Sequence, residues 1–234
     1  MTERAAQERY AIYFAPEAAS PLWQFGTSWL GRNPETGDTT VARFGLSPET
    51  HAAITASPRR YGFHATLKPP FRLLPGTPLE QLTAALQAFS AGRTGFDIPA
   101  IKVDDIDGFL AFVPDVPVAP LADLACDCVT AFDRFRAPAS DAEIARRRPH
   151  ALSPRQREYL DSWGYPYVLE EFRFHMTLTE RLEPEVIPDI RACLDTAAAH
   201  LAGEPVRVSE IALYVEREPG APFELRQRFP FGTA

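Results

Sequence analysis

Two short segments of the sequence place a histidine two residues before a threonine, between hydrophobic residues. These segments span residues 63–67 (FHATL) and 174–178 (FHMTL). Their composition is typical of β-strands, in which successive side chains point to opposite faces. His64 therefore shares a strand face with Thr66, and His175 shares one with Thr177. Each segment offers an imidazole and a hydroxyl group in the same direction.

Two histidines and two threonines in one cleft would suit the cleavage of a phosphodiester. A neutral imidazole accepts a proton from the attacking oxygen, and a protonated imidazole donates one to the leaving oxygen. The ordinary histidine pKa of about 6.5 allows both forms near neutral pH. Threonine hydroxyls donate hydrogen bonds to phosphate oxygens, and Lys68 or Arg173, expected beside the histidines, would offset the negative charge. This chemistry requires neither a metal ion nor another cofactor.

Other side chains are weaker candidates for the walls of the cleft. Lys68 and Arg173 also have a structural interpretation, because cations at exposed strand positions often protect sheet edges. Tyr13, on the first predicted strand, and Tyr165 or Tyr167 are candidate substrate contacts, although aromatic residues often belong to the core. Three histidines lack the threonine partner and are assigned no chemistry: His51, His150 and His200.

The surrounding elements repeat in order, which predicts how the two segments meet. Each histidine segment is followed by an amphipathic helix, a strand and a further strand. This duplication predicts two related lobes whose polar strand faces meet in one cleft. The predicted helices start at Pro21, Pro48, Pro78 and Pro154, each after a hydroxyl residue, with two more over 121–135 and 187–201. The predicted strands cover 10–15, 61–69, 98–103, 109–113, 172–179, 206–215 and 223–229.

Composition excludes several classes of protein. The 234 residues carry a net charge of −7, which argues against bulk nucleic-acid binding. No uncharged stretch is long enough to span a bilayer, and the first ten residues do not resemble a secretory signal, so we expect a cytoplasmic protein without a membrane partner. The sequence contains no glycine-rich phosphate loop. Three cysteines without metal-type spacing predict buried, reduced thiols.

The paired motifs resemble those of the two-histidine (2H) phosphoesterase superfamily, and both match at every required position. The wider segments YGFHATLKPPF (61–71) and WGYPY (163–167) are similar to one branch, the uncharacterised proteins associated with bacterial phosphonate-metabolism operons. The resemblance covers nearly the whole chain. It implies an α+β, bilobal, pseudo-two-fold fold with antiparallel sheets flanking a central cleft and helices packed outside. It also implies that His64, Thr66, His175 and Thr177 occupy the catalytic positions.

The resemblance leads us to expect residues 1–234 to form a single bilobal domain. The first lobe is predicted at about 58–116 and the second at about 168–231. An insert at about 136–167, which contains three consecutive arginines at 146–148, lies between them. Smaller RNA-processing members of the superfamily lack this insert, which argues against an RNA substrate.

The implied activity is that of a phosphoric diester hydrolase, a metal-independent cyclic phosphodiesterase acting on a small phosphorylated substrate. Carbon–phosphorus lyase pathways generate a ribose 1,2-cyclic phosphate ester, so a small ribose cyclic phosphate is the preferred substrate. One alternative is a 2′,3′-cyclic nucleotide or RNA-end phosphodiesterase. Another is an accessory protein that binds a phosphorylated metabolite without turnover. A zinc hydrolase is less suited, because no closely spaced histidine pair with carboxylates occurs.

Overall fold

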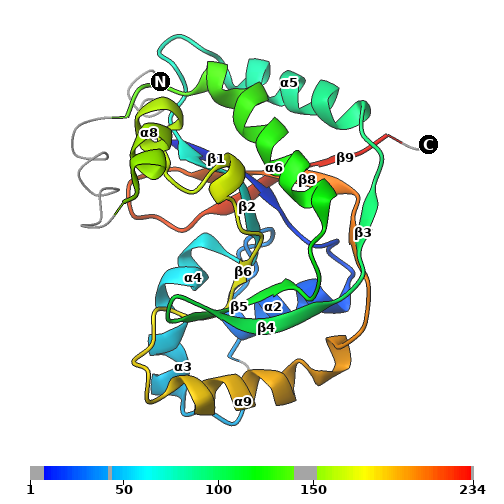
Figure 1. The fold of residues 1–234 in the computed structure, drawn as a ribbon, viewed down its shortest axis with the longest axis vertical. Coiled ribbons are helices and arrows are strands. Elements are labelled where there is room, and N and C mark those ends of the chain that lie inside the picture. The colour runs from blue at the N-terminus through cyan, green and yellow to red at the C-terminus, as the bar shows by residue number, and fades with distance from the viewer. Residues whose placement is uncertain (1–7, 42–43, 140–151, 233–234) are drawn as a thin grey trace.

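A computed structural model of the chain describes residues 8–41, 44–139 and 152–232, which build one antiparallel sheet of seven strands. The strand order is β4-β5-β6-β2-β1-β8-β9, and β3 pairs separately with β7 (Figure 1). The predicted α+β class with antiparallel sheets is confirmed. The strands are β1 Arg9–Phe14, β2 Ala65–Phe71, β3 Phe96–Ile98, β4 Ile101–Ile106, β5 Phe109–Pro114, β6 Met176–Thr177, β7 Val206–Val208, β8 Glu210–Glu216 and β9 Glu224–Pro230.

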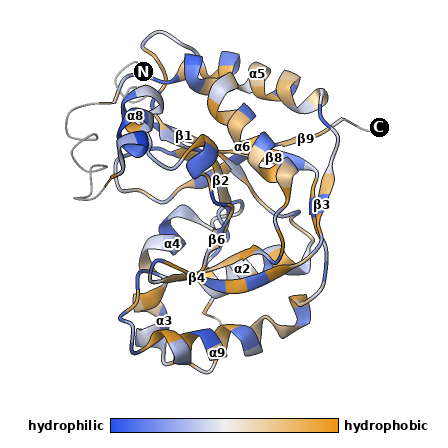
Figure 2. Ribbon diagram, viewed as in Figure 1, coloured by the Kyte–Doolittle hydropathy of each residue, from blue (hydrophilic) through white to orange (hydrophobic). Residues whose placement is uncertain are grey.

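Helices lie at both ends of the molecule in Figure 1, with α5, α6 and α8 at the top and α3 and α9 at the bottom. Figure 2 shows hydrophobic and hydrophilic residues mixed along α5 and α9, as expected of helices with one buried face. The helices are α2 Pro21–Leu30, α3 Pro48–Ile54, α4 Ala56–Tyr61, α5 Leu79–Ala91, α6 Ala119–Phe132, α8 Pro154–Trp163 and α9 Ile187–Ala197, with short 3-10 helices η1 Asp133–Phe135, η2 Leu169–Glu171 and η3 Ala199–Leu201.

The two histidine strands, β2 and β6, are neighbours in the middle of the sheet. Beyond β2 lie β1, β8 and β9, and beyond β6 lie β5 and β4. Each half of the sheet therefore mixes strands from both repeated units, because β4 and β5 follow β2 in the chain but pair on the side of β6. The contiguous lobes predicted at 58–116 and 168–231 consequently do not coincide with the halves of the sheet. The predicted insert contains α8, whereas the arginines at 146–148 lie outside the described residues.

Both histidine strands are shorter than expected. The strand predicted over 61–69 is interrupted because α4 extends to Tyr61 and is capped by Gly62, whose φ of 80° lies in the left-handed region that favours glycine. β2 therefore begins directly after His64. In the second segment, predicted as a strand over 172–179, the ladder is only two residues long. Each histidine thus stands at the entrance of its strand.

The serine–proline pairs in the sequence correctly predicted the starts of three helices. The side chains of Ser20, Ser47 and Ser153 each accept a hydrogen bond from a backbone N–H in the first turn of the following helix, as predicted. The expected hydroxyl cap at Thr77 is wrong: α5 begins one residue later than expected, and Pro78 is its cap without a side-chain hydrogen bond. The helix itself is confirmed.

The core packs helices directly against the histidine segments. Trp29 of α2 donates a hydrogen bond from Nε1 to the carbonyl of Leu178, at 2.8 Å. Gly26 of the same helix lies under Phe63, where a Cβ atom would stand 2.2 Å from the ring. The three cysteines are free thiols. Within the described residues, no helix is long and apolar enough to cross a bilayer.

Candidate active site

The four motif side chains lie on one face of two neighbouring strands. The middle residues of the two motifs pair with each other in antiparallel register. Residues on either side of such a pair point to the opposite face of the sheet. The register therefore puts His64 opposite Thr177 and Thr66 opposite His175. The hydroxyl of each motif is thus placed beside the imidazole of the other.

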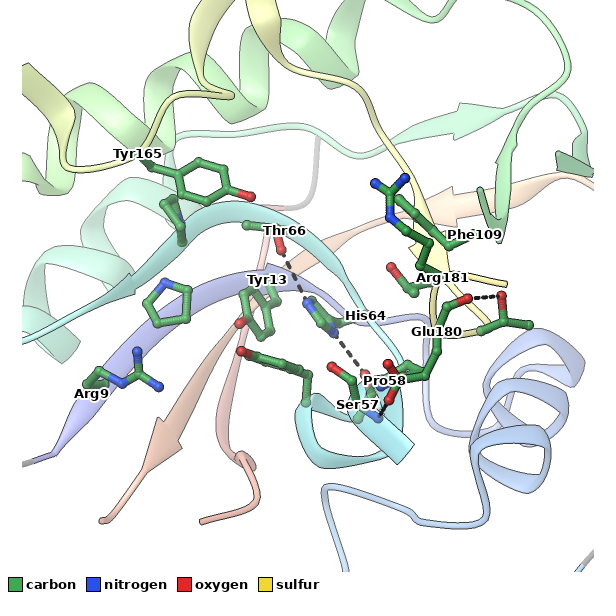
Figure 3. Close-up of a pocket in the computed structure, with 16 residues that line it drawn as sticks. Arg9, Tyr13, Ser57, Pro58, His64, Thr66, Phe109, Tyr165, Glu180 and Arg181 are labelled. Atoms are coloured by element: carbon green, nitrogen blue, oxygen red, sulfur yellow. Dashed lines mark hydrogen bonds between the residues drawn. The ribbon is translucent and has the colours of Figure 1, made fainter. Parts of the chain in front are cut away.

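Both ring nitrogens of His64 have hydrogen-bond partners (Figure 3). Nδ1 lies 2.8 Å from the carbonyl oxygen of Gly62, and Nε2 lies 3.2 Å from Oγ1 of Thr66. Because a carbonyl oxygen can only accept, Nδ1 carries the proton of the neutral ring, and Nε2 carries the lone pair. The Thr66 hydroxyl then donates to Nε2. A proton-accepting nitrogen is therefore held in place beside Thr66.

His175 repeats this arrangement in the second motif. Its Nδ1 lies 2.7 Å from the carbonyl oxygen of Arg173, again two residues earlier in the chain. The same tautomer follows, and Nε2 is left as the ring nitrogen that can meet a ligand. The Phe109 ring flanks the imidazole at a tilt of 58°, with 5.6 Å between the two centroids. The two histidines are thus fixed by equivalent backbone hydrogen bonds.

The surroundings favour the neutral form of both imidazoles. Burial, with a smaller contribution from nearby His175, lowers the pKa of His64 to about 4, although the hydrogen bond to Gly62 opposes the shift. Burial likewise lowers the pKa of His175, and the Arg173 guanidinium adds to this effect. In the free protein at neutral pH, both Nε2 atoms are therefore unprotonated.

Tyr13 covers one face of the His64 ring. The two rings are stacked, with 3.7 Å between centroids and 21° between planes. Tyr13 itself is buried, and its strand β1 pairs with β2 so that Tyr13 lies opposite Thr66. The tyrosine predicted as a candidate contact therefore stands directly beside a motif histidine.

The motif residues line two adjoining cavities. The first, of about 420 Å³, is bordered by His64, Thr66 and Thr177 (Figure 3). The second, of about 240 Å³, is bordered by Thr66 and His175. Thr66 belongs to both. The other shared lining residues are Pro69, Phe109, Tyr165 and Arg181. The two imidazoles therefore reach neighbouring cavities with a common wall.

Lys68 does not share this face, and its predicted position beside the histidines is wrong. The pairing of β1 with β2 shifts between Tyr13, opposite Thr66, and Ile12, opposite Lys68, so that Leu67 forms a β-bulge. The bulge breaks the alternation of faces. Lys68 is buried, and its Nζ donates to the carbonyl of Val129 and to Oδ1 of Asp133, both at 3.1 Å. It joins β2 to α6 and η1.

Arg173 and Tyr167 border the second cavity only. Arg173 lines it beside His175, and Tyr167 is 45% exposed at its edge. The hydroxyl-bearing ring that reaches both cavities is Tyr165, which packs edge-on against Tyr167 with 5.6 Å between centroids. Both predicted contacts therefore lie near His175 and away from His64.

Sequence reasoning missed several lining residues, among them two arginines and a tyrosine. Arg181 borders both cavities, and Figure 3 shows it beside Phe109. Arg9 and Tyr61 border the first cavity. None of these belongs to a motif. A search for cations within a few residues of each motif would have found Arg181, four residues after Thr177, whereas Arg9 comes from a distant strand.

Two of the three histidines without a threonine partner are described by the structure, and neither borders the two cavities. His51 packs edge-on against Trp29 in the core, with 5.2 Å between centroids. His200 lines a separate cavity beside η3. His150 lies outside the described residues. In the part of the chain that the structure describes, no three His, Cys, Asp or Glu side chains gather closely enough to hold one metal ion.

Comparison with known families extends over most of this fold. Residues 66–224 match the family described as "Protein of unknown function (DUF1045)". The chain belongs to the DUF1045 family. The match begins at Thr66 and includes the whole second motif. The two His-x-Thr motifs, on which the resemblance to the two-histidine phosphoesterases rests, enter neighbouring strands of the sheet of this DUF1045 chain.

Curated relatives of this DUF1045 chain carry a kinase name. A "Ribose 1,5-bisphosphate phosphokinase PhnN" of Janthinobacterium sp. (strain Marseille) is 42% identical over 229 residues, covering 95% of this chain and 51% of the relative. The protein of the same name from Laribacter hongkongensis (strain HLHK9) is 38% identical over 218 residues, covering 93% and 50%. The chain thus spans about half the length of the curated relatives it matches.

Solved structures of E. coli LigT are similar at a lower level. The apo form is 16% identical with a TM-score of 0.48, and the complex with 3′-AMP is 14% identical with a TM-score of 0.47. Both alignments cover 97% of this chain and 99% of the LigT chain.

Proposed function

We propose that this DUF1045 chain is a metal-independent phosphodiesterase that opens a small cyclic phosphodiester by general acid–base catalysis. The observation that carries the proposal is the pairing of the two motifs. It sets two imidazoles and two hydroxyls on one face, with both Nδ1 atoms bound to backbone carbonyls. The Nε2 atoms are then the ring nitrogens for proton transfer, an arrangement that suits hydrolysis of a phosphodiester by general acid–base catalysis.

His64 acts as the general base in this proposal. Its low pKa keeps Nε2 unprotonated over the physiological range. Nε2 accepts a proton from a water molecule as the water oxygen bonds to phosphorus. The hydrogen bond from Nδ1 to Gly62 fixes the ring. The Thr66 hydroxyl, which donates to Nε2 in the free protein, turns to the phosphate when the substrate binds and leaves the lone pair to the water molecule. The base thereby needs no reorientation during the reaction.

His175 acts as the general acid. An anionic phosphate ester bound between the cavities stabilises the imidazolium form and raises the pKa of His175 from its depressed value. The bond between phosphorus and the leaving ring oxygen breaks, and that oxygen takes the proton from Nε2 of His175. The products are one hydroxyl group and one phosphate monoester. The proton accepted by His64 returns to solvent, and His175 takes one up.

Hydroxyl and guanidinium groups stabilise the charge on the phosphate. Thr177 donates a hydrogen bond to a non-bridging oxygen, and so does Thr66 once its hydroxyl has turned away from His64 Nε2. Arg181 replaces Lys68 as the compensating cation near the reacting centre, because it borders both cavities whereas Lys68 is bound to Asp133. Arg173 provides a further cation on the His175 side.

A phosphorylated ribose is the substrate class we favour. The relatives' printed name gives a ribose bisphosphate as substrate of those whole proteins, of which this chain matches about half. A ribose 1,2-cyclic phosphate contains both the ribose of that name and a cyclic phosphodiester, which is the ester that the proposed two-histidine reaction opens. The kinase activity in the name is a second candidate, to be assayed with ATP and ribose 1,5-bisphosphate. The absence of a glycine-rich phosphate loop from the sequence favours the hydrolase.

A panel of substrates tests the proposal. The purified chain is assayed in EDTA with ribose 1,2-cyclic phosphate and with nucleoside 2′,3′-cyclic phosphates. We expect turnover of the sugar ester, faster than that of the nucleotides. Faster nucleotide turnover would support the RNA-end alternative. Tight binding without turnover of any ester would support the accessory binding protein and contradict the hydrolase.

A further inference from the structure

Arg9 lines a part of the first cavity that lies away from the motif residues. It lies four residues before Tyr13 on β1, so the two side chains share a strand face. Both border the cavity, and Figure 3 shows Arg9 on the far side of Tyr13 from Arg181. The cavity wall thus has a guanidinium group at each of two separate places, with His64 between them.

Glu216 holds Arg9 in position. The two residues are directly opposite on β1 and β8, and the Arg9 Nε donates to Oε2 of Glu216. The other carboxylate oxygen, Oε1, accepts from Arg60 Nη1 and from the backbone N–H of Gly220, both at 3.0 Å. Glu216 is fully buried. Two guanidinium groups around one carboxylate leave a net positive charge at this end of the cavity.

Hydrogen-bond donors remain available beside Arg9. Across the described residues, the Arg9 guanidinium makes its one protein hydrogen bond through Nε. The Tyr61 hydroxyl accepts from Arg60 Nη2 at 2.7 Å, so its own proton is free to be donated. Tyr61 lines the same cavity. The phenols of Tyr61 and Tyr13 lie close enough to contribute to the raised pKa of Arg9, behind the larger effect of Glu216.

We propose that Arg9 and the Tyr61 hydroxyl form a second anion subsite, which binds a phosphate monoester of the same substrate molecule. The inference rests on the proposed function: the cyclic ester lies between His64 and His175, and the monoester extends along the first cavity to Arg9. A guanidinium fork that already uses Nε on a carboxylate offers its Nη groups to phosphate oxygens. The substrate is then the cyclic phosphate of a sugar phosphate. Its opening yields a sugar that carries two phosphate monoesters.

Selectivity between two matched substrates tests the subsite. The wild-type chain is assayed with ribose 1,2-cyclic phosphate and with the same ester phosphorylated at O5. We expect kcat/KM to be about 10- to 100-fold higher for the phosphorylated ester, because charge-assisted hydrogen bonds to one phosphate are gained. Arg9→Gln should reduce this ratio at least tenfold. Arg217→Gln, an exposed arginine on the same molecule that pairs with Glu224, is the matched control and should leave the ratio unchanged.

Two further measurements keep the test decisive if Arg9→Gln does not fold. Tyr61→Phe retains the ring stacked on Phe223 and should lower the ratio several-fold. Ribose 5-phosphate, which has the monoester but no cyclic ester, should inhibit the wild type competitively. Equal kcat/KM for the two esters, with no inhibition by ribose 5-phosphate, would overturn the subsite while leaving the hydrolase intact. No turnover of either ester would instead contradict the proposed function.

Discussion

The phenol ring of Tyr13 is stacked on the imidazole of His64, with 3.7 Å between the ring centroids. The contact buries the ring and helps to keep water away from it. Burial is the main reason why the pKa of His64 falls to about 4. The packing of Tyr13 on His64 thus favours the neutral imidazole, which is the protonation state that the proposed base requires.

An acidic pH optimum follows from the two depressed pKa values. The free enzyme needs His64 neutral and His175 protonated, so kcat/KM should fall as pH drops through about 4 and also as pH rises through the pKa of His175, which is lowered from 6.5. We expect the maximum of kcat/KM below pH 6.5. A pH–rate profile with a cyclic ester measures it. An optimum above pH 7.5 would contradict these assignments.

Stability should also depend on His64. Its pKa is about 6.5 in the unfolded chain and about 4 in the folded protein, so the unfolded chain binds more protons between these values. The contribution of His64 is complete above pH 6.5 and is lost as pH falls towards 4. From pH 7 to pH 5 we expect roughly 2 kcal/mol of lost unfolding free energy from this residue. Urea titrations should show a smaller pH dependence for His64→Gln; an unchanged dependence would refute the shift.

Lys68→Met should destabilise the protein without weakening substrate binding. The buried ammonium group donates hydrogen bonds to the Val129 carbonyl and to the Asp133 carboxylate. Its removal leaves Arg136 as the remaining ion-pair partner of Asp133 among the described residues. We expect a loss of about 1–3 kcal/mol in unfolding free energy. KM should stay within about twofold of the wild type, since Lys68 borders neither cavity of the site. A KM increase of tenfold or more in a stably folded variant would show instead that Lys68 contributes to substrate binding.

Gly26→Ala tests the support of the first motif. A Cβ atom at this position would meet the buried Phe63 ring at 2.2 Å, so either the ring or α2 must move. Overpacking of this kind costs about 1–3 kcal/mol. Because His64 follows Phe63, we also expect kcat to fall. Unchanged thermal stability and activity would show that α2 does not hold the motif in place. Gly92→Ala is the control for general loss of a glycine, because its φ is −87° and a Cβ atom there would meet nothing within 4 Å.

The sequence predicted those parts of the site that depend on local alternation. His64, Thr66, His175 and Thr177 share a face because their spacing is two and each motif enters a strand. Lys68 has the same spacing from Thr66, yet the bulge at Leu67 turns it away. A bulge depends on how β1 pairs with β2, which no pattern within the motif records.

Long-range pairing explains most of the remaining differences. The helices α5 and α9 and the three serine caps depend on neighbouring residues and were predicted correctly. No strand order was predicted, because β4 and β5 pair beside β6 across a large sequence separation. The position of Arg9 at the cavity was not predicted either, because it also depends on long-range strand pairing. Its place follows from β1 lying between β2 and β8, which periodicity alone does not encode.

Hydrolysis of a cyclic ribose phosphate in EDTA, compared among the wild type, His64→Ala and His175→Ala, tests the account most directly. Each substitution should lower kcat about 100- to 10,000-fold, with ligand affinity changed only modestly. Near-wild-type turnover by either variant, or wild-type activity that disappears with EDTA and returns with zinc, would contradict catalysis by the two histidines.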